Sequence, residues 1–230
     1  MKRNIRKPVL FAILVLMFLN ISLVACEKVI NQQEIKDELD LQESDQNSSK
    51  KSIMFVNLER LPKEILSKEE TEGLIYLREE EKLARDVYQA MYEFFPIGPF
   101  INIPKSEQQH MDAIKFLLDR YELMDPAYGK GPGEFTNSDL QGLFTKLTES
   151  GKVDVKEALK VGALIEEIDI QDLQRELDNH VDNQDIQFVY NNLISGSKNH
   201  LRAFTRVLKT YGIEYIPVVL TEQQYLEIVN

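Results

Sequence analysis

The sequence predicts an all-α protein organised as a four-helix bundle, with a long crossover between the second and third long helices and a short C-terminal extension. Apolar residues recur at intervals of three and four over four long segments, which places them on one face of a helix. Capping residues, prolines and glycines mark where these segments begin and end. Each segment also sets an ionisable residue near the middle of its apolar stripe.

The N-terminus has the layout of a secretion signal. A basic stretch, MKRNIRK, is followed by an apolar run over residues 8–19 and by LVAC at 23–26. This order is typical of a signal peptide, and its last four residues resemble the lipobox of bacterial lipoproteins, in which the peptide is cut before the cysteine and the cysteine carries lipid. We therefore expect a signal peptide over residues 1–25 and a lipid on Cys26. The protein would then be anchored to a membrane of the bacterial cell envelope, on the extracytoplasmic side. The alternative is an uncleaved membrane anchor with a chance cysteine.

The mature chain would be strongly acidic. Loss of residues 1–25 leaves 205 residues and removes four basic residues and no acid, so the net charge moves from −11 to −15. Such a charge argues against nucleic acid as a partner and suits the attraction of cations. Cys26 is the only cysteine, which excludes a disulfide or a cysteine-based metal site in the mature protein. Residues 26–52 are rich in polar and acidic residues and predict a flexible acidic tether, followed by one folded domain over 53–230.

The first long helix is expected to begin at a capping box, Ser67-Lys-Glu-Glu70, and to run to about Phe95. Its apolar stripe passes through Glu81, the last of three consecutive glutamates at 79–81. Glu81 is therefore the one expected to face the core. The alternative is that all three glutamates form a solvated face, which is what this helix favours when it is considered alone.

The second long helix is expected from about Pro99 to Met124, with the Asp-Pro pair at 125–126 as its stop. It carries Glu107-x-x-His110 on the same face as Ile114. Residues three apart leave a helix side by side, so the Glu107 and His110 side chains should point together toward the core.

The remaining elements follow after a loop rich in glycine and proline. A short helix, capped near Asn137 or Ser138 and ending at Gly151, completes an excursion long enough to cross the bundle. The third long helix is expected over residues 153–177, with Glu166 in its stripe and Glu167 beside it. The fourth is expected over 182–211, with His200 in its stripe and Gly212 after its end. The tail should be extended to Pro217 and helical after Thr221.

The ionisable residues within the stripes indicate a metal centre. Burying an uncompensated carboxylate costs several kcal/mol, and a shared divalent cation would offset this cost for all of them at once. Glu-x-x-His on an inward helix face is used by di-iron and di-manganese bundles. Iron, manganese and zinc all accept carboxylate and imidazole, so the ligand types do not choose among them. The candidate ligands are Glu81, Glu107, His110, Glu166 and His200.

Four segments carry a resemblance to known proteins. EKLARDVY (81–88) and the segment from residue 100 to His110 are similar to the first and second helices of the ferritin-like superfamily, rubrerythrin-type domains in particular. More closely, REEEKLARDVY (78–88), SEQQHMDAIKFLLDRY (106–121), IEEIDIQDL (165–173) and GSKNHLRAF (196–204) resemble a bacterial and archaeal ferritin-like family catalogued as domain of unknown function 2202. The resemblance implies an all-α bundle with a dinuclear metal centre, and it implies no particular reaction.

One position departs from the ferritin-like pattern. Fourth helices of that superfamily usually carry a second Glu-x-x-His, whereas this chain has Ser197 and His200. A bridging carboxylate is therefore missing. Either Glu167 or Asp169 fills the gap, or the site holds one metal tightly.

Two functional hypotheses stay open at this point. The first is a metal-handling or redox protein that holds iron or manganese and reacts with oxygen or peroxide, with an external electron donor because no cysteine set for a rubredoxin-like iron centre is present. The second is a non-enzymatic envelope scaffold with structural metal or none, and in either case a homodimer is an open alternative. Hydrolysis has little support, since no Gly-x-Ser-x-Gly, P-loop or His-Glu-x-x-His motif occurs.

Overall fold

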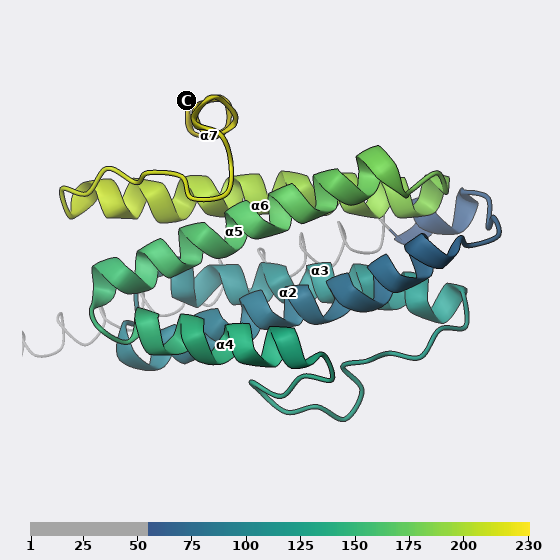
Figure 1. The fold of residues 1–230 in the computed structure, drawn as a ribbon, viewed down its shortest axis with the longest axis horizontal. Coiled ribbons are helices and arrows are strands. Elements are labelled where there is room, and N and C mark those ends of the chain that lie inside the picture. The colour runs from purple at the N-terminus through teal and green to yellow at the C-terminus, as the bar shows by residue number, and fades with distance from the viewer. Residues whose placement is uncertain (1–54) are drawn as a thin grey trace, which may run out of the picture. The chain divides into compact units, whose positions relative to one another are not determined.

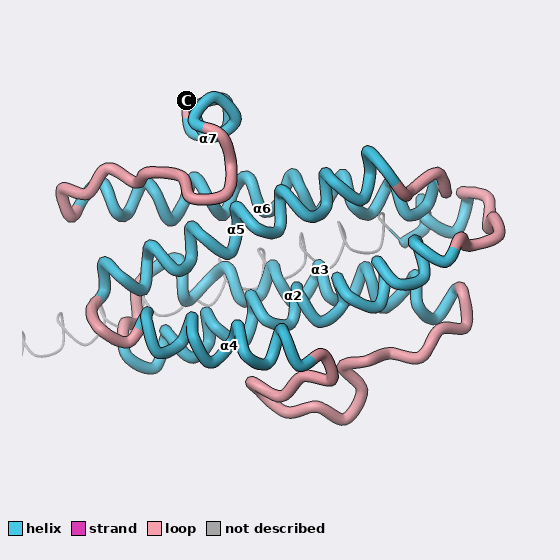
Figure 2. Tube along the Cα trace, in the orientation of Figure 1, coloured by secondary structure: helices cyan, strands magenta, loops and turns pink. Residues whose placement is uncertain are grey.

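Residues 55–230 are described by the computed structural model, and every regular element in this range is helical (Figures 1 and 2). This confirms the predicted all-α class. The expected signal peptide, the tether and Cys26 lie outside the described residues. No helix within 55–230 combines the length and the hydropathy needed to cross a membrane. Residues 55–60 are helical, and the labelled elements are α2 (Lys68–Phe94), α3 (Gly98–Arg120), α4 (Ser138–Gly151), α5 (Val155–Asn179), α6 (Gln184–Thr210) and α7 (Glu222–Val229).

The four long helices form two antiparallel hairpins that pack face to face. α2 pairs with α3 and α5 pairs with α6, while α2 also packs on α5 and α3 on α6 (Figure 1). α2 and α5 run antiparallel, since Tyr88 bonds to Glu166 whereas Gly73 lies beside Glu176. α3 and α6 are antiparallel as well. It follows that α3 and α5 are parallel, so the connection between them must travel back along the bundle.

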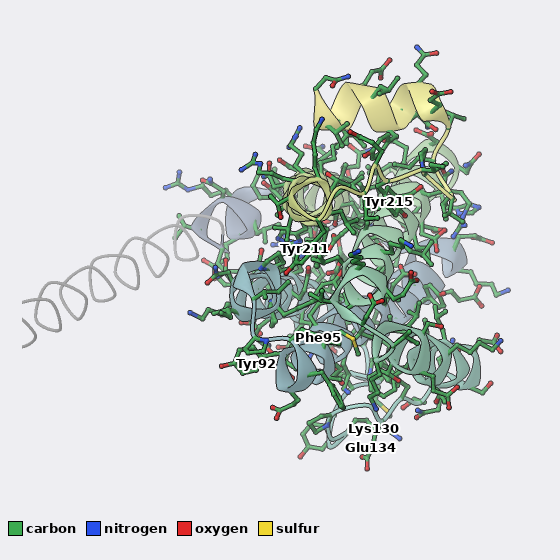
Figure 3. All side chains as sticks on the ribbon, turned by 90° about the vertical axis from the view of Figure 1, so that its left-hand side faces the viewer. Tyr92, Phe95, Lys130, Glu134, Tyr211 and Tyr215 are labelled. Atoms are coloured by element: carbon green, nitrogen blue, oxygen red, sulfur yellow. The ribbon has the colours of Figure 1, made fainter. Side chains whose placement is uncertain are left out.

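Residues 121–154 make this crossover, as predicted. The segment includes α4, which packs against both α2 and α5. At the other side of the bundle α7 packs on α6 and runs across the long helices, seen end-on in Figure 1 and lengthwise in Figure 3. Figure 3 places Lys130 and Glu134, in the crossover loop, on the side opposite to α7.

Most helix ends follow the capping signals in the sequence. Ser67 and Glu70 form the predicted capping box of α2, and Asn137 caps α4. α2, α4, α5 and α6 begin and end within two residues of the predicted limits.

The predicted end of α3 at Met124 is wrong, because the helix stops at Arg120. Glu122 adopts a left-handed conformation with φ of 59°. Its amide bonds to the carbonyl of Asp119, and the amide of Leu123 bonds to that of Leu118. These two bonds form a Schellman motif, which usually places glycine where Glu122 stands.

The charged run at 78–82 is buried, which overturns the alternative of a solvated glutamate face. Glu79, Glu80 and Glu81 are 2%, 3% and 1% exposed. Glu79 accepts hydrogen bonds from two amides of the crossover, those of residues 136 and 137. Glu79 thus helps to hold the crossover loop against α2.

The basic residues of the same run also hold the crossover. Arg78 donates to both carboxylate oxygens of Asp125 and to the carbonyl of Met111. Lys82 pairs with Asp86 and donates to the carbonyl of Gly131 at 2.8 Å. One turn of α2 therefore fixes the loop on one side and leaves Glu80 and Glu81 for the interior.

Candidate metal centre

The ionisable residues of the four apolar stripes meet inside the bundle, where they form two groups that share Glu107. The first group is Glu81 of α2 with Glu107 and His110 of α3. The second is Glu107 with Glu166 of α5 and His200 of α6. In each group one ligand atom per residue lies within 4.8 Å of the others, and every member is buried. The structure thus brings together all five residues that the stripes single out.

In the first group, His110 directs Nδ1 at two carboxylates. This atom lies 3.1 Å from Glu81 Oε2 and 2.8 Å from Glu107 Oε2. The opposite edge of the ring faces Gly196 of α6, where a Cβ atom would lie 2.4 Å from His110 Nε2. Any side chain at position 196 would displace the ring, so the site requires glycine there.

In the second group, His200 also directs Nδ1 inward. The atom lies 2.8 Å from Glu107 Oε1 and 3.4 Å from Glu166 Oε2. Its Nε2 lies 3.0 Å from the hydroxyl of Ser106. When Nε2–H donates to that hydroxyl, Nδ1 keeps its lone pair toward the carboxylates, which is the tautomer that a metal ligand needs.

Several of these short contacts lack the direction of a hydrogen bond. Within residues 55–230, both oxygens of Glu107, Oε2 of Glu166 and Nδ1 of His200 have no hydrogen-bond partner, although they are buried and lie close together. The same atoms lie within ion-pair range of a neighbouring carboxylate or imidazole, at 2.8 to 3.4 Å, but are not aimed as hydrogen bonds. Carboxylates and imidazoles that converge in this way on a common space fit a cation placed between them.

Tyr88 orients one of the carboxylates. Its hydroxyl donates to Glu166 Oε1 at 2.6 Å, and its ring is fully buried against Phe100 and Phe204. This bond turns Oε2 of Glu166 toward His200. Tyr88 is therefore a hydrogen-bond partner of a candidate ligand.

Both imidazoles are stabilised as cations by the surrounding carboxylates. Burial alone would lower the pKa of His110, but Glu81 and Glu107 raise it to about 10. Burial acts in the same direction on the pKa of His200, and Glu107 and Glu166 raise that pKa well above its ordinary value. At neutral pH, protons on the rings therefore compensate the carboxylates in the absence of metal.

The three carboxylates differ in their electrostatic surroundings. Burial would raise the pKa of Glu107, but the two histidines together bring it below its ordinary value. Burial raises the pKa of Glu166 to about 7 against the opposing effect of His200. Burial also raises the pKa of Glu81, which His110 opposes. Glu107, which contacts both histidines, is thus the most strongly ionised member.

Glu167 points away from both groups and binds the C-terminal tail. Its carboxylate accepts hydrogen bonds from the hydroxyl of Tyr215 and from the amides of residues 218, 219 and 220. Figure 3 shows Tyr215 on the side of the bundle where α7 lies. Glu167 is fully buried, but it serves the tail and is not brought to the centre.

Asp169 lies closer to the centre but in neither group. It is buried, its Oδ2 has no hydrogen-bond partner within residues 55–230, and burial together with Glu81 and Glu80 raises its pKa well above the ordinary value. Ser197, at the position of the missing carboxylate, donates to the carbonyl of Leu193 at 3.2 Å.

Three residues at the centre were not singled out as functional from the sequence: Ser106, Gly196 and Glu80. Ser106 directly precedes Glu107 in α3, so its place beside the Glu-x-x-His motif indicates that it lies near the centre. Its contact with His200 of α6 depends on tertiary packing and cannot be predicted from the sequence. Glu80 is buried with both oxygens unpartnered in the described part of the chain. Periodicity could not separate it from its two glutamate neighbours.

The donor set of the centre is three carboxylates and two imidazoles, which suits iron, manganese or zinc. The glutamate side chains are at most 1% exposed, whereas both histidine side chains are 10% exposed. The histidine edge is therefore the part of the centre nearest to solvent.

Comparisons with known proteins give a consistent family but no activity. Residues 70–230 match the family described as "Uncharacterized protein domain (DUF2202)". The chain is 48% identical over 177 residues to "Uncharacterized protein MJ0754" of Methanocaldococcus jannaschii, which covers 77% of this chain and 95% of that protein. The crystal structure of hypothetical protein MJ0754 from Methanococcus jannaschii matches with a TM-score of 0.72 at 49% identity, over 74% of this chain and 96% of that one.

Proposed function

The chain belongs to the uncharacterized domain family DUF2202, and on that premise we propose that its bundle is a metal-binding domain that holds two divalent ions, iron or manganese, in its interior. The observation that carries the proposal is the convergence of buried carboxylate and imidazole atoms from four helices, in two groups whose ligand atoms lie within 4.8 Å of one another. Glu107 belongs to both groups, so it would help to hold an ion in each of them.

The arrangement of the helices supports a relationship with the ferritin-like superfamily. Its bundles have one long crossover and build their metal sites from inward-facing carboxylates and histidines on all four helices. This chain has that connection in residues 121–154, and its candidate ligands come from α2, α3, α5 and α6. Ser197 replaces the usual fourth-helix carboxylate, which leaves three glutamates for the two ions.

Bound iron or manganese would supply one-electron redox chemistry toward oxygen or peroxide. The residues of the chain have separate roles around it. Glu81, Glu107, His110, Glu166 and His200 would hold the ions, Tyr88 orients Glu166, and Ser106 fixes the tautomer of His200. The glutamate side chains are at most 1% exposed, which keeps bulk water from them, and a small oxidant would approach along the histidine edge, where both side chains are 10% exposed.

The test of this proposal is the metal content of protein purified without chelator. We expect about two ions per chain in the wild type, as the two groups imply, and loss of most bound metal in His110→Ala. Glu157→Gln is the control, because Glu157 lies on α5, pairs with Lys160 and belongs to neither group. Unchanged metal in His110→Ala would contradict the proposal. A wild type that is metal-free and equally stable would favour a scaffold role instead.

We also propose that lipid on Cys26 anchors the domain to an envelope membrane, with the bundle outside the cytoplasm. The proposal rests on the order of basic, apolar and LVAC segments at residues 1–26. Metabolic labelling with a radioactive fatty acid should mark the wild type and leave Cys26→Ser unlabelled. Equal labelling of both proteins would contradict it.

A further inference from the structure

An acidic pocket opens between α2 and α5, apart from the two groups of candidate ligands. It has a volume of about 260 Å³. Glu69 and Glu72 of α2 and Asp172 and Glu176 of α5 line it, together with Arg175 and His180. Lys68 pairs with Glu72 at 3.4 Å, and His180 lies 3.0 Å from Glu176. Four carboxylates against the two fixed cations Arg175 and Lys68 leave an excess of negative charge at the pocket.

Carboxylates continue from this pocket toward the centre, one on each turn of α5. Glu176, Asp172, Asp169 and Glu166 follow one another at intervals of four, three and three residues. At 1.5 Å per residue, the ten residues from Glu176 to Glu166 span about 15 Å. The last of the four is a candidate ligand, so the series links the pocket to the centre.

α2 completes the series from the opposite side. Gly73 lies beside Glu176, and Tyr88 bonds to Glu166, so the part of α2 between them runs along the same stretch of α5. Glu80 lies within this part, next to Glu81. Asp172 and Glu81 are the carboxylates whose charges act on it most strongly. It therefore stands between the pocket residue Asp172 and the candidate ligand Glu81.

Buried polar atoms without partners lie along this path. The hydroxyl of Tyr190 is fully buried and unpartnered among residues 55–230, and it lies 3.5 Å from the position of a Cβ on Gly73, which lines the pocket. Farther in, both oxygens of Glu80 and Oδ2 of Asp169 are unpartnered and buried as well. Each of these oxygens lacks a hydrogen bond of good direction in the described part of the chain and can accept a contact from a cation. Asp172 and the charge of Arg175 are near Glu80.

We propose that this pocket captures divalent cations from solution and that Asp172, Glu80 and Asp169 pass them to the centre. The inference rests on the proposed function, because it supplies the ions of the same centre. Arg175 contacts Asp172 at 2.6 Å and Glu176 at 3.5 Å, and its side chain is 50% exposed. An arriving cation displaces this guanidinium into solvent and takes over its two carboxylates.

The test follows the rate at which the metal-free full chain takes up Co²⁺, measured by stopped-flow absorption. Asp172→Asn and Glu176→Gln each remove one negative charge from the pocket and should slow uptake about tenfold, with the same final metal content and the same Tm as the wild type. Glu157→Gln is the matched control. Glu157 lies on the same helix and pairs with Lys160 three residues later, as Asp172 pairs with Arg175.

The outcomes separate this inference from the proposed function. Slow uptake in the two pocket variants, with full final content and a normal rate in Glu157→Gln, supports the route. Unchanged rates with full content overturn the route and leave the centre intact, and so does equal slowing in Glu157→Gln. Reduced final content in Asp172→Asn would make Asp172 a ligand and also overturns the route. A wild type that binds no Co²⁺ refutes both proposals.

Discussion

Adjacent glutamates on α5 have opposite roles at the scale of single residues. Glu166 points to the centre and Glu167 to the tail, because neighbouring positions on a helix differ by about 100° in direction. The stripe of α5 places Glu166 among apolar residues, so its inward direction could be predicted from the sequence. The partners of Glu167 are backbone amides more than fifty residues later. No local pattern shows that such an extended segment will return to α5.

The hydrogen bond from Tyr88 to Glu166 predicts a loss of metal affinity in Tyr88→Phe. The substitution keeps the ring but removes the donor that holds Glu166 Oε1. Loss of an outer partner of a ligand typically costs about 10- to 100-fold in metal affinity, which competition with a chromophoric chelator would measure. Tyr128→Phe is the control, since this tyrosine of the crossover is 86% exposed and belongs to neither group. Equal affinity in Tyr88→Phe and the wild type would contradict the orienting role.

The protonated histidines predict that metal binding releases protons. The pKa of His110 is raised to about 10 and that of His200 is also raised, so both rings carry a proton at pH 7 in the metal-free protein. Ligation requires neutral rings and ionised carboxylates, and the pKa values of Glu166 and Glu81 are raised as well. Filling both groups should therefore release at least about two protons, and the apparent affinity should rise as the pH rises toward 10. Calorimetric titrations in buffers of different ionisation enthalpy would count them. A binding enthalpy that is independent of the buffer would contradict the prediction.

At the scale of elements, helix starts were more predictable than helix ends. Ser67, Asn137 and Thr221 accept hydrogen bonds from nearby amides as their residue types suggest. A second Schellman motif ends α6, where the amides of Gly212 and Ile213 bond to the carbonyls of Lys209 and Leu208. The two motifs differ in the residue at the left-handed position. Gly212, after α6, has the residue type that the left-handed position favours, whereas Glu122, after α3, does not. The end of α3 therefore could not be found from composition.

This contrast predicts opposite effects of two substitutions. Glu122→Gly relieves the left-handed strain of a residue whose side chain is 88% exposed, and it should raise the free energy of unfolding by about 1 kcal/mol. Gly212→Ala introduces the same strain, with no atom near the new Cβ, and should lower it by about as much. Urea denaturation measures both. Destabilisation by Glu122→Gly would mean that its contact with Lys63 outweighs the strain.

At the scale of the whole molecule, the number of long helices and the crossover could be predicted from the sequence. The convergence of the candidate ligands on one place in the bundle could not. Periodicity shows that each side chain faces inward, whereas the register between helices depends on packing. The buried run at 78–82 is the clearest example. Its charges looked suited to solvent, and it is the crossover and α5 that enclose them.

A centre built from four helices predicts that metal stabilises the folded domain as a unit. Free metal at about one hundred times Kd should add about 2.7 kcal/mol for each of the two sites, or about 5.4 kcal/mol in all, and raise Tm by about 10 to 20 °C. Glu107→Gln should abolish this increment, because Glu107 belongs to both groups, while Glu157→Gln should retain it. Differential scanning calorimetry with and without a chelator measures the change. An increment that survives in Glu107→Gln would place the bound metal elsewhere.

The bonds from the tail to Glu167 also bear on how the protein can be handled at the bench. The segment after Gly212 ends in a short helix outside the four long helices, so it could be mistaken for a dispensable part of the domain. Trimming it would strip a tyrosine hydroxyl and three amides from a carboxylate that neighbours a candidate ligand. A version shortened at the C-terminus would therefore disturb the surroundings of the candidate centre as well as the tail.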